Sequence, residues 1–141
     1  RKVIPFLQKT RADLLVDNGL AVLEYPGATA TLRASVTEVE GMRHRRLVVC
    51  GTRGTVEIYP LEPPAARYRL DALKVRLTLL EDTEAFKAGS QFVEMPVMNG
   101  RYTDQMLEFA RIVRGEIANP YPYEHEYLVQ ETLMAACGLE H

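Results

Sequence analysis

The residue pair with the most chemical character is His125-Glu126, which begins like the HExxH zinc-binding motif of metalloproteases. That motif needs a second histidine four residues after the first, because only that spacing puts two metal ligands on one face of a helix. Val129 occupies the position here. We therefore expect a solvated helix start and no metal site.

A local basic cluster lies at residues 43–46, with the sequence RHRR. Two glutamates, Glu38 and Glu40, precede it, and no set of aromatic residues suited to stacking on bases accompanies it. A solvated loop is the first interpretation. The alternative is contact with an anion or a phosphate group, made by Arg43, Arg45 and Arg46.

Other patterns that could carry catalysis are missing from the sequence. No GxGxxG phosphate-binding motif is present, and the GTRG at 51–54 lies between two expected strands, which favours a hairpin turn over a nucleotide-clamping loop. Outside the last three residues the histidines are His44 and His125, and neither has the sequence context of an activated nucleophile. We predict no catalytic, cofactor-binding or metal-binding residue in this chain.

The elements that would position any site begin with four strands between Leu20 and Leu61, with turns at Pro26-Gly27, Gly41 and the GTRG segment. Residues 28–36 alternate small apolar side chains with hydroxyls and one arginine, the period of two that places them on opposite faces of a sheet. Residues 47–50 are continuously apolar, which predicts a strand covered on both faces, and residues 56–59 should be its hairpin partner.

Further strands are expected at residues 3–7, 67–80 with a break at 71–73, and 91–95, and Asp17-Asn18-Gly19 is expected to form a turn. After Gly100 the apolar spacing becomes helical. Thr103 or Asp104 should cap a helix that Gly115 ends, and a second helix should stop at Gly138.

These elements predict an α+β fold, a mainly antiparallel open β-sheet with two C-terminal helices packed on one face. Residues from the apolar faces of strands and helices should form its core. They are Leu32, Val49, Val56, Phe109, Val113 and Leu133.

The composition is typical of a globular domain that binds neither nucleic acid nor a membrane. The 141 residues fit one domain, and 17 basic against 19 acidic residues give a net charge of −2, so neither nucleic acid nor membrane binding is expected. Cys50 and Cys137 are expected to be buried thiols, which indicates a cytoplasmic location. Residues 139–141 resemble an expression-tag remnant, so the domain is assigned to residues 1–138.

The order of the elements is more specific than any single motif. Segments LAVLEYPGATATLRASV, LVVCGTRGTVEIYPLEPP and YTDQMLEFARIVRGEIANPYPYEHEYLVQETLMAAC follow one another. Together they resemble the C-terminal domain of the glucose-fructose oxidoreductase, inositol dehydrogenase and MocA (Gfo/Idh/MocA) family. The positions that match the family pattern are Gly51, Thr52, Gly54, Thr55 and Val56 in the hairpin, and Gln105, Phe109, Val113, Gly115 and Pro120 in the helix and its exit.

The resemblance implies a parent oxidoreductase that acts on a sugar or polyol, with a Rossmann domain that binds NAD or NADP. Its C-terminal sheet domain would shape the substrate site, mediate oligomerisation and have the Rossmann domain of the same parent chain as a partner. The family's cofactor-binding glycines, its Glu-Lys-Pro segment and its Asp-x-x-x-His pair lie upstream of the matched part. No catalytic role therefore passes to a numbered residue, and no cofactor is expected in this chain itself.

A homo-oligomer interface is expected on the hydroxyl-bearing side of the alternating strand, at Thr29, Thr31, Arg33, Ser35 and Thr37. Small side chains let another flat sheet approach closely, whereas a solvated face more often carries long Lys and Glu side chains. The alternative function is a free-standing dimeric interaction module or a small-ligand-binding module, without catalysis.

Overall fold

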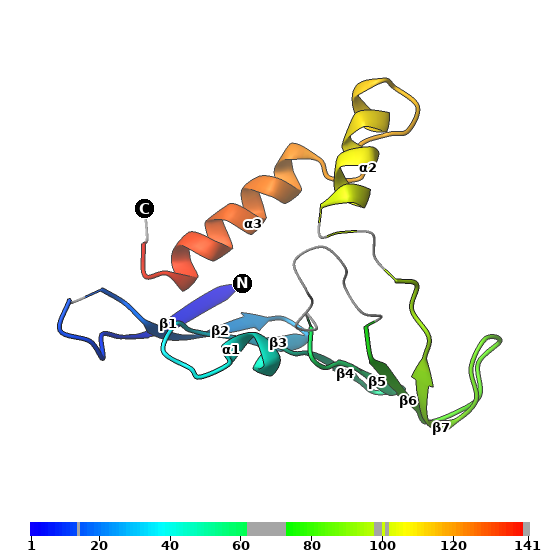
Figure 1. Cartoon of the computed structure of the whole chain (residues 1–141), viewed down its shortest axis with the longest axis horizontal. Helices are drawn as coiled ribbons and strands as arrows, with labels where there is room; N and C mark the ends of the chain where they lie inside the picture. Colours follow the sequence, from blue (N-terminus) through cyan, green and yellow to red (C-terminus); the bar gives the residue numbers. More distant parts are fainter. Residues whose placement is uncertain (14, 62–72, 98–99, 101, 140–141) are drawn as a thin grey trace. The chain divides into compact units, whose positions relative to one another are not determined.

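The computed structural model describes residues 1–13, 15–61, 73–97, 100 and 102–139. It has two compact units, coloured along the chain in Figure 1. The first unit comprises Arg1–Val39 and Ala118–His141, and the second comprises Glu40–Ile117. Each unit contains its own antiparallel sheet.

The first unit is a three-stranded sheet with one helix on it. Its strands β1 (Lys2–Gln8), β2 (Asn18–Tyr25) and β3 (Ala28–Ser35) pair in that order. Helix α3 (Tyr123–Ala136) contacts β1 and β2 (Figure 1).

The contact between α3 and the sheet accounts for the core of the first unit. Ala21 and Leu23 on β2 are only 4% and 5% exposed. Leu7 lies on the same face, because its partner across β1 and β2 is Gly19, two residues before Ala21. A Cβ atom built on Gly138, just past α3, would lie 3.0 Å from Leu7 Cδ1. This face of the sheet is therefore the one that α3 covers.

The second unit is a four-stranded sheet with two helices. Strands β4 (Leu47–Gly51), β5 (Gly54–Ile58), β6 (Val75–Leu79) and β7 (Gly89–Val93) pair in sequence order. Helix α1 (Gly41–His44) precedes the sheet and α2 (Thr103–Val113) follows it. Residues 41–44, expected to be loop, thus form one short helical turn.

The predicted hairpin at residues 51–54 is confirmed, with Gly51 pairing Gly54. Its second glycine is required by close packing: a Cβ atom built on Gly54 would lie 2.6 Å from the carbonyl oxygen of Thr78 on β6. No side chain fits at that distance without moving β5 or β6.

The α+β class is confirmed, and the strands divide between two sheets where the sequence pattern predicts one. Between β3 and β4 the chain leaves the extended conformation, first in bends at residues 36–38 and then in α1. No tight hairpin therefore joins β3 to β4, and each of these strands is the edge of its own sheet. Within the described residues, the clear helix-on-sheet packing is that of α3 on β1 and β2.

Several local expectations are corrected. Asp17-Asn18-Gly19 is not a turn, because β2 already begins at Asn18 and the loop that joins β1 to β2 spans residues 9–17. The cap position of α2 is Tyr102, because Thr103 is already the first helical residue. The helix ends are confirmed at Gly115 and Gly138, which both have a φ of 72°. The strand expected at residues 67–80 is confirmed for β6, and residues 67–72 lie outside the described part of the chain.

The predicted core is wrong for most of its members. Five of the six side chains, those of Leu32, Val49, Phe109, Val113 and Leu133, are between 46% and 68% exposed. Val56 is half-buried. Periodicity predicts which side of an element is apolar, but it carries no information on whether a second layer covers that side.

The prediction of buried cysteines is also wrong, since the thiols of Cys50 and Cys137 are exposed. Strand β4, expected to be covered on both faces, is exposed throughout. In the part of the chain that the structure describes, no helix has both the length and the apolar composition needed to cross a membrane.

Candidate functional site

The surface most suited to a function is the side of the first sheet that faces away from α3. We call it the open face and define it by strand register. Its members come from all three strands, namely Lys2, Ile4, Phe6, Gln8, Asn18, Leu20, Val22, Glu24, Thr29, Thr31, Arg33 and Ser35.

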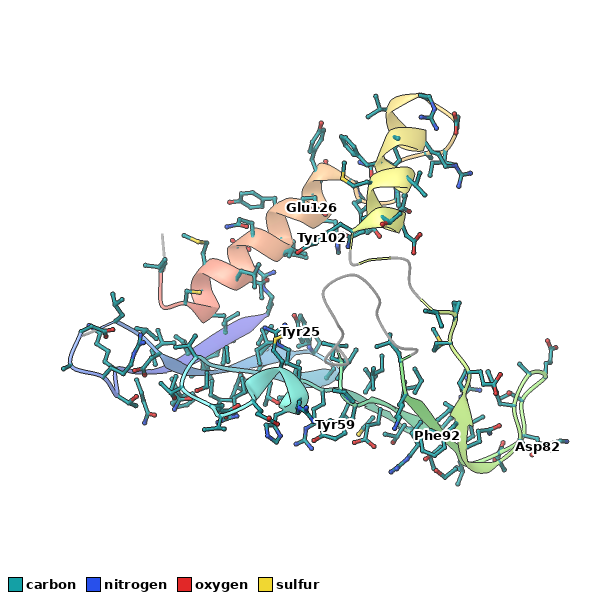
Figure 2. The ribbon with its side chains drawn as sticks, viewed as in Figure 1. Tyr25, Tyr59, Asp82, Phe92, Tyr102 and Glu126 are labelled. Atoms are coloured by element: carbon teal, nitrogen blue, oxygen red, sulfur yellow. The ribbon has the colours of Figure 1, made fainter. Side chains whose placement is uncertain are left out.

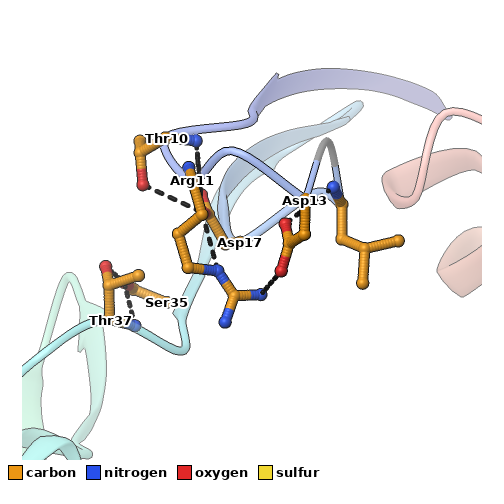
Figure 3. Close-up of polar contacts among 7 residues, drawn as sticks. Thr10, Arg11, Asp13, Asp17, Ser35 and Thr37 are labelled. Carbon is orange, nitrogen blue, oxygen red and sulfur yellow. Dashed lines mark hydrogen bonds and ion pairs between the residues drawn. The ribbon is translucent and has the colours of Figure 1, made fainter.

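Four of the five predicted interface residues are members of this face. Thr29, Thr31 and Arg33 are exposed on β3, and Ser35 is half-buried at the end of the strand. Thr37 is exposed but lies beyond the strand, where its backbone N–H and its hydroxyl both contact the Ser35 hydroxyl, at 3.4 Å and 3.1 Å (Figure 3).

The open face also has an apolar centre, which sequence reasoning missed. Phe6 on β1 lies opposite Leu20 on β2, and Leu20 lies opposite Arg33 on β3. Phe6 is 55% exposed and Leu20 is 38% exposed. Residues 20–23 are all apolar, so alternation could not assign them to faces; only the pairing register with β3 does so.

Arg33, the one cation predicted at the interface, is paired within its own chain. Its guanidinium forms an ion pair with the Glu38 carboxylate, and 60% of its side chain remains exposed. At an exposed site such a pair contributes little to stability, so Arg33 remains available for contact with a partner.

Part of the positive charge of the basic cluster at residues 43–46 is also neutralised by a carboxylate of the same chain. Nε of Arg43 lies 3.0 Å from the Glu40 carboxylate, and the backbone carbonyl of Arg45 accepts a hydrogen bond from Leu61 N–H at 2.7 Å. Contact of an anion with Arg43, Arg45 and Arg46 stays a prediction.

A buried carboxylate organises the loop between β1 and β2. The side chain of Asp17 is fully buried and accepts hydrogen bonds from the backbone N–H groups of Thr10, at 3.0 Å, and Arg11, at 3.0 Å (Figure 3). The Thr10 hydroxyl donates a further bond at 2.9 Å, and the Arg11 guanidinium lies 3.3 Å away.

Asp17 is structural, because every donor around it comes from its own loop. The bond from the Thr10 backbone N–H is the main reason why the pKa of Asp17 lies below its ordinary value of 3.8; the Thr10 hydroxyl and Arg11 act in the same direction, against the effect of burial. Its backbone carbonyl also accepts a hydrogen bond from Val36 N–H at 3.0 Å. Asp17 thus holds the loop together through its carboxylate and links it to the end of β3 through its backbone carbonyl.

The second sheet carries an oriented charge pair beside an aromatic ring. The Arg76 guanidinium carbon lies 5.4 Å from the centre of the Phe92 ring, and its Nη1 lies 3.6 Å from the Glu57 carboxylate. Register places the three side chains in one row across β5, β6 and β7, with Phe92 labelled in Figure 2. Phe92 is 67% exposed.

One hollow borders β7, with a volume of about 610 Å³ and open to solvent. It is lined by Leu73, Lys74, Phe92, Val93, Glu94 and Met95.

The histidine that resembles a metal ligand lies in the first turn of α3. His125 is exposed there and its ring centre lies 6.4 Å from that of Tyr121. Within residues 1–13, 15–61, 73–97, 100 and 102–139, no group of three or more His, Cys, Asp or Glu side chains is placed to hold a metal ion.

Comparison with known proteins finds a similar fold but no similar sequence. No family model matches the chain. No curated protein matches it either. A solved structure, that of the "YPO2259 putative oxidoreductase from Yersinia pestis", aligns with 98% of the chain at a TM-score of 0.58 and 18% sequence identity. The chain spans 42% of the length of that protein. At this identity the similarity establishes a shared fold: the chain folds like one part of a protein described as an oxidoreductase.

Proposed function

We propose that this chain is the substrate-site and oligomerisation domain of an NAD(P)-dependent oxidoreductase of the Gfo/Idh/MocA type, acting on a sugar or polyol. The observation that carries the proposal is the similarity in fold over 98% of the chain to 42% of a protein described as an oxidoreductase. A fold does not by itself establish which reaction a protein catalyses. The assignment to this family therefore rests on the order of the motifs in the sequence.

The hairpin geometry supports the motif match. In the resemblance, the two glycines of the G-T-x-G pattern are Gly51 and Gly54. The structure gives a physical reason for the second of them, because the Thr78 carbonyl leaves no room for a side chain at Gly54. The lack of space for a side chain explains why a glycine occupies this position of the G-T-x-G pattern.

The proposal is tested by the coding sequence that precedes Arg1. It should encode a strand, a GxGxxG turn and a helix, followed by a lysine-containing Glu-Lys-Pro segment. The longer polypeptide should reduce NAD or NADP in the presence of at least one member of a panel of sugars and polyols. A start codon directly before Arg1, or a longer polypeptide that binds no dinucleotide, would refute the assignment and favour the free-standing module.

We further propose that the open face joins two copies of the chain. Its apolar centre at Phe6 and Leu20 is flanked on β3 by small hydroxyl side chains and by Arg33, the composition of an interface with an apolar core and a polar rim. Helix α3, the helix that the described residues of this unit contain, covers the opposite face of the same sheet.

The size of the open face predicts a weak association. Strands of seven, eight and eight residues, about 4.8 Å apart and rising about 3.3 Å per residue, give a flat area of about 360 Å². Stable interfaces bury about 800 Å² per partner. We therefore expect the dimer of this chain to dissociate on dilution.

Light scattering at a series of protein concentrations tests this interface. The unmodified chain should show a mass that rises toward two chains with concentration, and Arg33→Glu and Leu20→Lys should remain monomeric. Arg53→Glu makes the same charge change in the turn between β4 and β5, at a residue that is not a member of the open face, and should behave like the unmodified chain. A monomer at every concentration, or an unaltered dimer in both open-face variants, would exclude this surface.

A further inference from the structure

We draw no further inference here: the strongest candidate, the exposed face of the β4–β7 sheet on which Arg76 lies over Phe92 and beside Glu57, carries nothing because nothing in the structure shows what covers it.

Discussion

Among single residues, Asp17 has the most unusual environment in the described chain. It combines a buried carboxylate with three donors from Thr10 and Arg11, all within its own loop (Figure 3). A carboxylate that accepts several hydrogen bonds is stabilised in its charged form, which lowers its pKa. The same bonds therefore make the stability of the loop depend on pH.

We expect Asp17→Asn to lower the stability of the chain at neutral pH, because the amide carries no charge and presents one acceptor oxygen where the carboxylate presents two. The folded-state pKa lies below 3.8, so the carboxylate contributes its full stabilisation above pH 3.8 and loses it as the pH falls through the folded-state pKa. Urea unfolding between pH 7 and pH 2 compares the unmodified chain with Asp17→Asn. The difference between their free energies of unfolding should shrink as the pH falls below about 3.8.

Asp13→Asn is the matched control, because it makes the same change in the same loop at a carboxylate that is 45% exposed. It should change the unfolding midpoint much less than Asp17→Asn. Equal effects of the two variants would show that the buried hydrogen bonds are not the source of the stability.

Among the secondary-structure elements, β5 and β6 approach each other closely at Gly54, the first residue of β5. The Cβ of an alanine at position 54 would lie 2.6 Å from Thr78 O and 2.9 Å from a methyl carbon of Leu79. A built Cβ at Gly27, in the turn between β2 and β3, meets no atom within 4 Å. Close packing therefore requires a glycine at position 54, whereas it does not require one at position 27.

Gly54→Ala should destabilise the second sheet by about 1–3 kcal/mol, since the new methyl forces β5 away from β6. Gly27→Ala should change stability by less than about 1 kcal/mol, because it has room and reduces the freedom of the unfolded chain. Denaturant unfolding of both variants measures the difference. A tolerated alanine at position 54 would mean that the two strands are not held at this spacing.

Helix α2 differs from the expectation for an amphipathic helix, because its apolar stripe is uncovered. Phe109 is 59% exposed, whereas Leu23 on β2 is 5% exposed. The cost of truncating a side chain depends on the burial that is lost and the cavity that remains.

Phe109→Ala should therefore cost less than about 1 kcal/mol, helped by the higher helix propensity of alanine. Leu23→Ala should cost about 2–5 kcal/mol, the range for a buried leucine. Unfolding midpoints of the two variants can be compared directly. A cost for Phe109→Ala as large as that for Leu23→Ala would show that α2 is covered in solution.

On the scale of the whole molecule, the chain is two compact units whose fold matches one part of a longer protein that is described as an oxidoreductase. Cofactor binding in the proposed family belongs to the Rossmann domain. There the dinucleotide's pyrophosphate is held by backbone N–H groups where a glycine-rich turn enters a helix. This sequence has no GxGxxG motif.

The 141-residue chain alone should therefore not bind NADH or NADPH, while the longer polypeptide that includes the preceding coding sequence should bind one of them. Calorimetric titration of each polypeptide with both dinucleotides measures this. Saturable binding by the chain alone would place a dinucleotide site within these residues. It would contradict the proposal that the dinucleotide binds to the Rossmann domain.

The sequence by itself determined the local features of this protein: the alternating strand that became β3, the hairpin at residues 51–54, and helix ends at Gly115 and Gly138. Each depends on residues within one or two turns or strands of one another, so short-range periodicity and glycine conformation were sufficient. Tertiary structure decided which apolar faces are covered. Leu23 became buried and Phe109 did not, although both lie in apolar patterns.

The same reason explains the division into two sheets and the missed apolar centre of the open face. Whether β3 pairs with β4, and on which face Phe6 and Leu20 lie, depend on strand register and on the path of the chain between strands. Each apolar side chain gains free energy from any layer that removes it from water, and the hydrophobic effect does not specify which layer that is. Pairing and packing between distant segments make that choice, and they are properties of the folded chain.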